Sequence, residues 1–547
     1  MWGLFFKASL LSIALSACQK KQVDAEQLLF NGQVHSLNEN DQLYEAVAIN
    51  KGEIIAVGRA DSLRDRFDFA EEFDLKGRHI YPSFNDAHAH FVGYAEGLLK
   101  VNLLGTKSAE EVIARCQTFA ATQAQAFIVG RGWDQNDWPE KSFPDKAILD
   151  SVFPQTPVVL KRIDGHAAWV NQAALDYAGI TAETSVEGGK ILLQDGQPSG
   201  ILIDNAVNLV KLPEMKRSEK ARAILQAQDS VFKYGLASLT DAGLGRSDIE
   251  LLDSLQQAGA LKLRINAMVR DDSASLAYFL KNGAIEKPRL RVKSAKYYLD
   301  GALGSRGALL IDPYADDPAN YGLQLIPTDY FRRQCERMLE AGWQVCVHAI
   351  GDSANRLAVR VMADVLQAER DRRWRIEHAQ IVRPIDVAAM AEYNIIPSVQ
   401  PTHATSDMYW AEARLGERIK YAYPYGNLWK ACSGLPLGTD FPVEAIDPLR
   451  TYRAAVFRQD DRGFPEGGFL PKQKLSPFQA LRGMTYYGAE ASFEEDKKGL
   501  IAPGYYADLV IFDKAIEDCS LAEINRLRPL ALLINGETVL ASDGLAL

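Results

Sequence analysis

Apolar and polar residues alternate at two different spacings along the middle of this chain. Eight short apolar segments have the length and composition of buried strands, and amphipathic stretches of helical spacing separate most of them. The segments are 79–86, 236–241, 262–269, 291–300, 343–349, 374–379, 395–401 and 433–440. Strands that alternate with helices predict β-α units around a parallel sheet, and eight strands match a closed (β/α)₈ barrel, the TIM barrel. A doubly wound open sheet is the alternative, but no glycine-rich dinucleotide fingerprint follows the first strand.

Both ends of the chain show short strands and tight turns instead. Near the N-terminus, "FNGQV" and "NKGEI" place Asn-Gly or Lys-Gly between apolar runs, as in β-hairpins. Residues 499–513 and 530–540 have the same character. We therefore expect residues 19–77 and 491–547 to build one composite β-sandwich domain, with the barrel at 78–490 between them.

A long segment separates the first two predicted barrel strands. Residues from about 100 to 225 exceed what a crossover helix needs, and they contain apolar runs of their own. An insertion after a strand emerges at the carboxyl end of a barrel, where active sites lie. We expect this segment to form a lobe that covers the substrate.

The first eighteen residues, "MWGLFFKASLLSIALSAC", have the pattern of a lipoprotein signal peptide. The apolar run 8–15 follows Lys7 and is too short to span a bilayer. "LSAC" resembles a bacterial lipobox, which implies cleavage before Cys18 and a lipid anchor on its sulfur. Gln19 then favours outer-membrane sorting, facing the periplasm. The alternative is an ordinary signal peptide followed by a chance cysteine.

Charge and cysteine content exclude several classes of site. The net charge of −10 and the lack of a basic block argue against nucleic acid as a partner. The other cysteines show no Cys-x-x-Cys spacing, so neither a disulfide framework nor a zinc–thiolate site is indicated. They are Cys116, Cys335, Cys346, Cys432 and Cys519. The sequence does not indicate an oligomeric state.

Histidines gather at the ends of the predicted strands. His88 and His90 in "NDAHAH" are alternate residues, so their rings can point to one side of an extended strand. His348 ends the fifth strand, His378 the sixth, and Asp440 the eighth. A lone histidine at any of these positions would be read as structural, but together these residues offer the ligands that zinc prefers. They predict one or two divalent ions, with Asp440 accepting a proton from the attacking water.

Several longer motifs, together with this ligand pattern, resemble the amidohydrolase superfamily. The motifs are "DGHAAWVN", "LTDAG", "KYYLDGALGSR", "VHAIGD", "IEHAQ", "LGTDFPV" and "GLIAPGYYADLVIFD". They are similar to the amidohydrolase-3 branch, which includes N-substituted formamide deformylases. The resemblance implies the barrel, the composite β domain and metal-dependent hydrolysis of a carbon–nitrogen bond. The lead-in "PSFNDAH" departs from it, with Ser83 and Asn85 where relatives carry glycine and an aliphatic residue.

Lys296 decides the expected number of metals. It matches the position at which many relatives carry a carboxylated lysine, whose carbamate bridges two ions. The resemblance thus implies a metal set of His88, His90, Lys296, His348, His378 and Asp440. In the alternative, Lys296 pairs with Asp300 or binds a substrate carboxylate, and a single metal is held by the remaining ligands.

Further candidates face the substrate. In "KRIDGHAAWVN" of the lobe, His166 is the leading candidate for substrate contact or transition-state polarisation, although a turn with a structural histidine is the alternative. His403 follows the seventh strand and could approach substrate or support a ligand. The candidate substrate-binding residues are Trp133, Arg162, Asp164, Asp300 and His403. For Trp133, packing inside the lobe is the favoured alternative to a substrate contact.

These observations favour an enzyme acting on a small-molecule amide, N-formyl compound or cyclic amide. A lactonase, dipeptidase or deaminase on the same site is the close alternative. A non-catalytic surface lipoprotein that binds a small ligand is the second class, which loss of a metal ligand would favour; the sequence retains every predicted ligand.

The lipobox generates a testable prediction. In a bacterial host we expect the full-length chain to partition with membranes, and Cys18→Ser to lose both lipid attachment and signal cleavage. Fractionation and intact-mass analysis of both proteins measure this. Identical processing and fractionation of the two would rule out the lipid anchor.

Overall fold

The computed structural model describes residues 23–122, 126–212, 215–369 and 371–542. Cys18, Lys7 and Gln19 lie outside the described residues, so the signal-peptide prediction is not addressed by the fold. Within the described ranges, no helix has the length and apolar character needed to cross a membrane.

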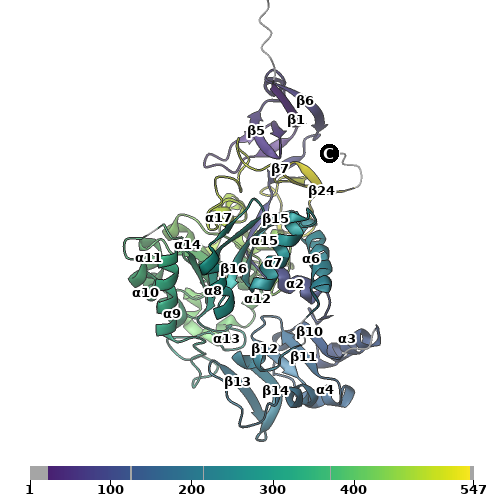
Figure 1. The fold of residues 1–547 in the computed structure, drawn as a ribbon. Helices are drawn as coiled ribbons and strands as arrows, with labels where there is room; N and C mark the ends of the chain where they lie inside the picture. Colours follow the sequence, from purple (N-terminus) through teal and green to yellow (C-terminus); the bar gives the residue numbers. More distant parts are fainter. Residues whose placement is uncertain (1–22, 123–125, 213–214, 370, 543–547) are drawn as a thin grey trace, which may run out of the picture.

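A ring of parallel strands forms the centre of the molecule, confirming the predicted barrel (Figure 1). In order around the ring, each bonded to the next, the strands are β8 (Phe84–Ala89), β15 (Leu236–Leu244), β16 (Arg264–Arg270), β18 (Leu290–Tyr298), β19 (Gln344–Ala349), β20 (Arg375–His378) and β21 (Ile396–Ser398). The predicted eighth strand is irregular, yet its backbone closes the ring. Gly438 donates to the carbonyl of Val399 at 3.0 Å, and Ala87 donates to that of Leu437 at 3.2 Å. This closure excludes the open-sheet alternative.

Amphipathic helices cover the outside of the ring. The main ones are α6 (Arg217–Phe232), α7 (Arg246–Gln257), α8 (Ser273–Asn282), α9 (Thr328–Ala341), α10 (Asp352–Leu366), α11 (Pro384–Glu392), α14 (Tyr425–Cys432) and α15 (Pro448–Val456). In α9 the buried residues Phe331, Cys335 and Met338 recur at helical spacing and so form one apolar stripe. The helix ends at Gly342, whose φ of 70° is a left-handed conformation that glycine adopts without steric cost.

The first predicted strand, 79–86, is two strands in two different sheets. β7 (His79–Pro82) pairs with β2 (Gln33–His35) and β22 (Leu509–Phe512) in the sandwich, whereas β8 belongs to the barrel. The crossing takes one residue: Ser83 donates to the carbonyl of Asp508 at 2.9 Å, and Phe84 donates to that of Gly235 at 3.0 Å. Both halves are largely buried, so no polar break in the sequence marks the change.

The two ends of the chain share one sandwich, as expected. Its six-stranded sheet runs β24 (Glu537–Ala541), β23 (Ala531–Ile534), β22, β7, β2 and β3 (Leu43–Tyr44). Its four-stranded sheet contains β1 (Val23–Phe30), β4 (Ala46–Asn50), β5 (Glu53–Gly58) and β6 (Phe67–Asp74). Leu29, Ile49 and Ile511 are among the buried residues that fill the space between strands from both ends of the chain.

The inserted lobe lies at the end of the barrel opposite the sandwich (Figure 1). Its sheet contains β9 (Val101–Asn102), β10 (Ile128–Trp133), β11 (Val158–Arg162), β12 (Ala167–Val170), β13 (Gly189–Gln194) and β14 (Gln197–Asp204). The lobe also carries α3 (Ala109–Thr122), α4 (Lys146–Val152) and α5 (Gln172–Ala178). Two separate apolar clusters support it, so the lobe is a packed unit rather than a long loop.

A buried ion pair joins barrel and sandwich. Arg264 of β16 donates from Nε and Nη2 to the two oxygens of Asp508, at 2.6 and 3.0 Å. Arg264 is 1% exposed, so its charge depends on this partner. Close by on the surface, Lys262 contacts Glu537 at 2.8 Å, with both side chains well exposed.

We predict that Asp508→Ala lowers the free energy of unfolding by about 3–5 kcal/mol, because it leaves the Arg264 charge buried and unpaired. Glu537→Ala is the matched control, and removal of an exposed pair costs about 1 kcal/mol or less. Urea unfolding of the three proteins measures both changes. Equal losses in the two variants would contradict the assignment of this pair as the joint between the domains.

Candidate active site

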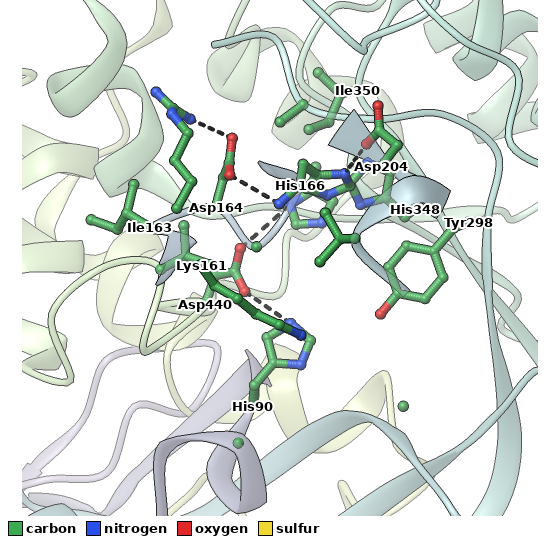
Figure 2. Close-up of a pocket in the computed structure, with 18 of the residues that line it drawn as sticks. His90, Lys161, Ile163, Asp164, His166, Asp204, Tyr298, His348, Ile350 and Asp440 are labelled. Carbon is green, nitrogen blue, oxygen red and sulfur yellow. Dashed lines mark hydrogen bonds and ion pairs between the residues drawn. The ribbon is translucent and has the colours of Figure 1, made fainter. Parts of the chain in front are cut away.

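A cavity of about 710 Å³ opens at the carboxyl end of the barrel, beneath the inserted lobe. Barrel residues on its wall include Lys296, His348 and His378, and the lobe contributes the loop around His166 (Figure 2). The carboxyl ends of the strands and the insertion therefore meet where barrel enzymes place their chemistry.

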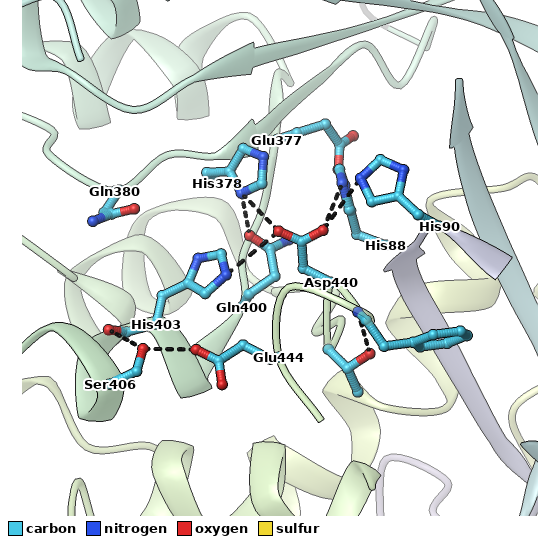
Figure 3. Close-up of polar contacts among 12 residues, drawn as sticks. His88, His90, Glu377, His378, Gln380, Gln400, His403, Ser406, Asp440 and Glu444 are labelled. Atoms are coloured by element: carbon cyan, nitrogen blue, oxygen red, sulfur yellow. Dashed lines mark hydrogen bonds and ion pairs between the residues drawn. The ribbon is translucent and has the colours of Figure 1, made fainter. Parts of the chain in front are cut away.

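Four of the predicted ligands, His88, His90, His378 and Asp440, point toward one another (Figure 3). His88, His378 and Asp440 each offer one ligand atom within 4.8 Å of the others. Nε2 of His90 lies 3.3 Å from Oδ1 of Asp440, and Nε2 of His88 lies 3.7 Å from the same oxygen. His348 joins the group, since its ring centroid lies 4.5 Å from that of His378. The structure thus brings together all the predicted histidine ligands and the aspartate.

The donor atoms suit a divalent cation. Nε2 of His88, Nε2 of His348 and Oδ1 of Asp440 are buried and have no hydrogen-bond partner among the described residues. Buried polar atoms are normally paired, and nitrogen and carboxylate donors aimed at one point are the ligands zinc takes. Two of the predicted ligand residues, His378 and Asp440, also have left-handed backbone conformations, with φ of 76° and 61°. Such conformations in residues other than glycine concentrate at functional sites.

A buried chain of charges orients His88. Nδ1 of His88 lies 2.5 Å from Glu377, and Arg375 donates to both oxygens of Glu377 at 2.7 and 3.0 Å. Burial would raise the pKa of Glu377, but Arg375 and His88 hold it far below its ordinary value. Burial, and then Lys296, lower the pKa of His88 to about 4, so its ring is neutral. The proton therefore lies on Nδ1 and leaves Nε2 free for a metal.

Sequence reasoning missed Arg375 and Glu377. Their signal is two opposite charges at alternate positions of an apolar strand, directly before His378 in "RIEH". Gln400 was missed too. Its side chain lies 2.7 Å from Nδ1 of His378 and fixes that ring in the same way.

Asp440 shares its second oxygen with His403. Nε2 of His403 lies 3.4 Å from Oδ2 of Asp440. Burial alone would raise the pKa of Asp440, but contacts with His403 and His90 hold it well below its ordinary value. Burial opposes the charge on His403, yet Asp440 raises its pKa to about 9. His403 also lines the cavity, so it borders the substrate space and contacts the aspartate at the same time.

The lobe holds His166 over the cluster. Nδ1 of His166 lies 2.7 Å from Asp204, and its backbone amide donates to Asp164 at 3.0 Å. Its ring centroid lies 5.2 Å from that of His348. Arg162 is buried between Asp134 and Asp164, with which it pairs, and so fixes the loop. Burial works against it, but Asp204 raises the pKa of His166.

Two predicted substrate contacts lie elsewhere. Trp133 is fully buried in the lobe core, where its indole donates to the carbonyl of Leu160 at 2.7 Å. Asp300 is fully buried too, and its oxygens accept from the amides of Leu309, Ile350 and Gly351 at 2.8–3.0 Å. Neither residue lines the cavity. The structure therefore places Trp133 in the packing alternative and turns Asp300 toward backbone amides, because the direction of these side chains depends on the packing of distant loops.

Lys296 is fully buried with its Nζ unpartnered among the described residues, and that nitrogen lies 4.7 Å from the ring centroid of Tyr298. The alternative pairing with Asp300 is not formed, since the backbone amides occupy that carboxylate. An ammonium buried without a counter-ion is costly, whereas a carbamate formed on Lys296 would be an anion and could bind the metals.

Comparisons with known proteins agree with this geometry. The model of the Amidohydrolase family matches residues 71–540. The chain is 28% identical over 524 residues to Putative amidohydrolase YtcJ of Bacillus subtilis (strain 168), covering 93% of this chain and 98% of the relative. It is 24% identical over 542 residues to N-substituted formamide deformylase of Arthrobacter pascens, covering 93% and 97%. A crystal structure of an uncharacterized metal-dependent hydrolase from Pyrococcus horikoshii OT3 aligns with a TM-score of 0.74 and 27% identity, covering 90% of this chain and 99% of that one.

We predict two equivalents of metal in the parent protein and at most one in Lys296→Ala, because the variant lacks the carbamate that would bridge the ions. Elemental analysis after purification without chelator gives the count. Lys293→Ala is the matched control on the same strand: its ammonium contacts Glu286 at 3.0 Å, away from the cavity. One equivalent in both the parent and Lys296→Ala would establish the single-metal alternative.

Proposed function

Because the chain belongs to the amidohydrolase family and has the site of a metal-dependent hydrolase, we propose that it hydrolyses a carbon–nitrogen bond of a small molecule. The proposed substrate is a non-peptide amide, an N-formyl compound or a cyclic amide. The relative named N-substituted formamide deformylase supports this bond type.

The observation that carries the proposal is the position of Asp440 between two groups of histidines. One oxygen faces His88 and His90, and the other faces His403. A divalent ion, zinc by the chemistry of this ligand set, would be held by His88, His90, His378 and Asp440, with His348 and Lys296 available for a second ion. It would polarise the substrate and activate water. With its low pKa, Asp440 is ionised and can accept the proton of the attacking water.

Breaking a carbon–nitrogen bond needs that proton again at the leaving nitrogen. Asp440 can deliver it, since the carboxylate borders the cavity where the nitrogen must lie. On the lobe side, His166 carries a proton on the nitrogen facing Asp204 and has its other ring edge toward the cavity. With its raised pKa it can donate to the oxygen on which negative charge develops.

A lactonase, dipeptidase or deaminase would use the same groups and remains the close alternative. A non-catalytic ligand-binding lipoprotein is disfavoured, because ligand atoms of His88, His378 and Asp440 lie within 4.8 Å of one another. We also propose that the chain is exported and held at the outer membrane by a lipid on Cys18; this rests on the sequence alone.

We predict that Asp440→Asn keeps the fold and lowers kcat by about 10²–10⁴-fold, because an amide cannot accept the proton of water. A screen of N-formyl amines, N-acyl amino acids, hydantoins and lactones at saturating zinc identifies the substrate on which to measure this. Asp461→Asn, on the exposed surface, is the matched control. Near-parental turnover by Asp440→Asn would remove the proton-shuttle role, and hydrolysis of lactones alone would contradict the bond assignment.

A further inference from the structure

Two positive side chains lie next to each other on the lobe wall of the cavity. Arg131 of β10 and Lys161 of β11 are direct neighbours in the register of the parallel pair, and both line the cavity. Figure 2 shows Lys161 in the same view as His90 and Asp440, extending from the lobe toward the barrel. Neither residue has a role in the proposed proton transfers or in metal binding.

The carboxylates around this cavity are engaged by groups other than Arg131 and Lys161. Each one on its wall has a partner within the described structure, either a cation, a hydroxyl, an amide or a histidine. Asp248, for example, contacts Lys220 at 2.6 Å, Asp241 accepts from the amide of Val92 at 2.9 Å, and Glu444 accepts from Ser406 at 2.6 Å. No wall carboxylate forms a direct ion pair with Arg131 or Lys161 in the described structure; Asp440 and Asp164 act on Arg131, and Glu96 acts on Lys161, only at longer range.

The side chains of Arg131 and Lys161 lack such direct partners in the part of the chain that the structure describes. Neither forms an ion pair with any residue in the described ranges. Arg131 donates from Nη2 to the carbonyl of Ile163 at 2.9 Å, and its buried Nε has no partner there. The side-chain amine of Lys161 has no hydrogen bond within the described residues. Burial, and then the charges of Lys100 and Arg131, lower the pKa of Lys161 to about 8.

Unpaired cations at the wall of a partly buried cavity raise the affinity for an anion, because the anion replaces water that the cations have lost. Arg131 also lies within the electrostatic reach of Asp440, the proton shuttle, and of Asp164 in the lobe loop. An anion bound there would therefore sit beside the bond being hydrolysed and not in a separate pocket.

We infer that the substrate carries a carboxylate, which Arg131 and Lys161 bind while the amide lies over His88, His90 and Asp440. This inference rests on the proposed function, and it narrows the substrate to a small-molecule amide with an anionic group near the scissile bond. A neutral amide bound in the cavity would leave both cations without a negatively charged partner.

The test uses two probes of nearly equal shape, N-acetylphenylalanine and N-acetylphenylalaninamide, which differ in charge. Calorimetric titration of the zinc-loaded full-length protein should show the acid binding about 10- to 100-fold more tightly than the amide, as expected for charge-assisted hydrogen bonds. Lys161→Met should lower this preference at least several-fold, and Arg131→Met with Lys161→Met should abolish it. Lys190→Met, a lobe lysine on the exposed surface, should leave it unchanged.

Affinity for the amide should stay within about two-fold in every variant, which separates loss of the anion site from a damaged fold. Arg131 also supports the carbonyl of Ile163, so Lys161→Met is the decisive single change. Preference for the acid that persists in the double variant would overturn the inference, since the metal alone would then bind the carboxylate. Equal binding of the two probes by the parent, or no binding of either, would overturn it as well.

Hydrolysis measured in the same samples keeps the two proposals apart. Hydrolysis of acid and amide with equal kcat/KM would remove the anion requirement and leave carbon–nitrogen hydrolysis standing. Selective binding of the acid that depends on Lys161, in a protein that hydrolyses no amide, would support the anion site and contradict the proposed reaction.

Discussion

The buried contact between Arg375, Glu377 and His88 is the constraint on which the barrel's interior depends. Arg375 also donates to the carbonyl of Ala87 at 2.6 Å and to the hydroxyl of Ser398 at 2.9 Å. One side chain thus links β20 to both β8 and β21, where the irregular eighth segment closes the ring. A fully buried cluster of charged side chains is stable only when all its members are present, because removal of one leaves the others desolvated and unpaired. The same three residues therefore stabilise the barrel and orient a metal ligand, so a change in any of them affects both.

The sequence predicts most of the fold because the barrel strands and their helices follow simple periodicities. It also predicts the ligand group, since His88, His90, His348, His378 and Asp440 all stand at strand ends. In a parallel barrel, strand ends share one rim, so position in the sequence is enough to bring them together. The composite sandwich follows from turn chemistry at both termini.

Other features depend on contacts that sequence spacing does not contain. Glu377 and His88 are 289 positions apart, so their pairing appears only once the ring has closed. The crossing from sandwich to barrel at Ser83 lies inside a continuous apolar run, because both sheets bury their share of it. Trp133 and Asp300 belong to segments in which the sequence predicts substrate contacts. Packing turns Trp133 into the lobe core and Asp300 toward backbone amides.

The crossing at Ser83 also governs how this protein can be divided. β7 is held on one side by β22, which comes from the far end of the chain, and β8 continues from it into His88 and His90. A cut between the two domains would detach β8, which leads into the first two ligands, from β7, and loss of the C-terminal segment would remove the partner strand of β7. The sandwich is therefore no detachable module. It fixes the start of the strand that leads to the metal ligands. A barrel expressed without it would begin with an unanchored strand next to its active site.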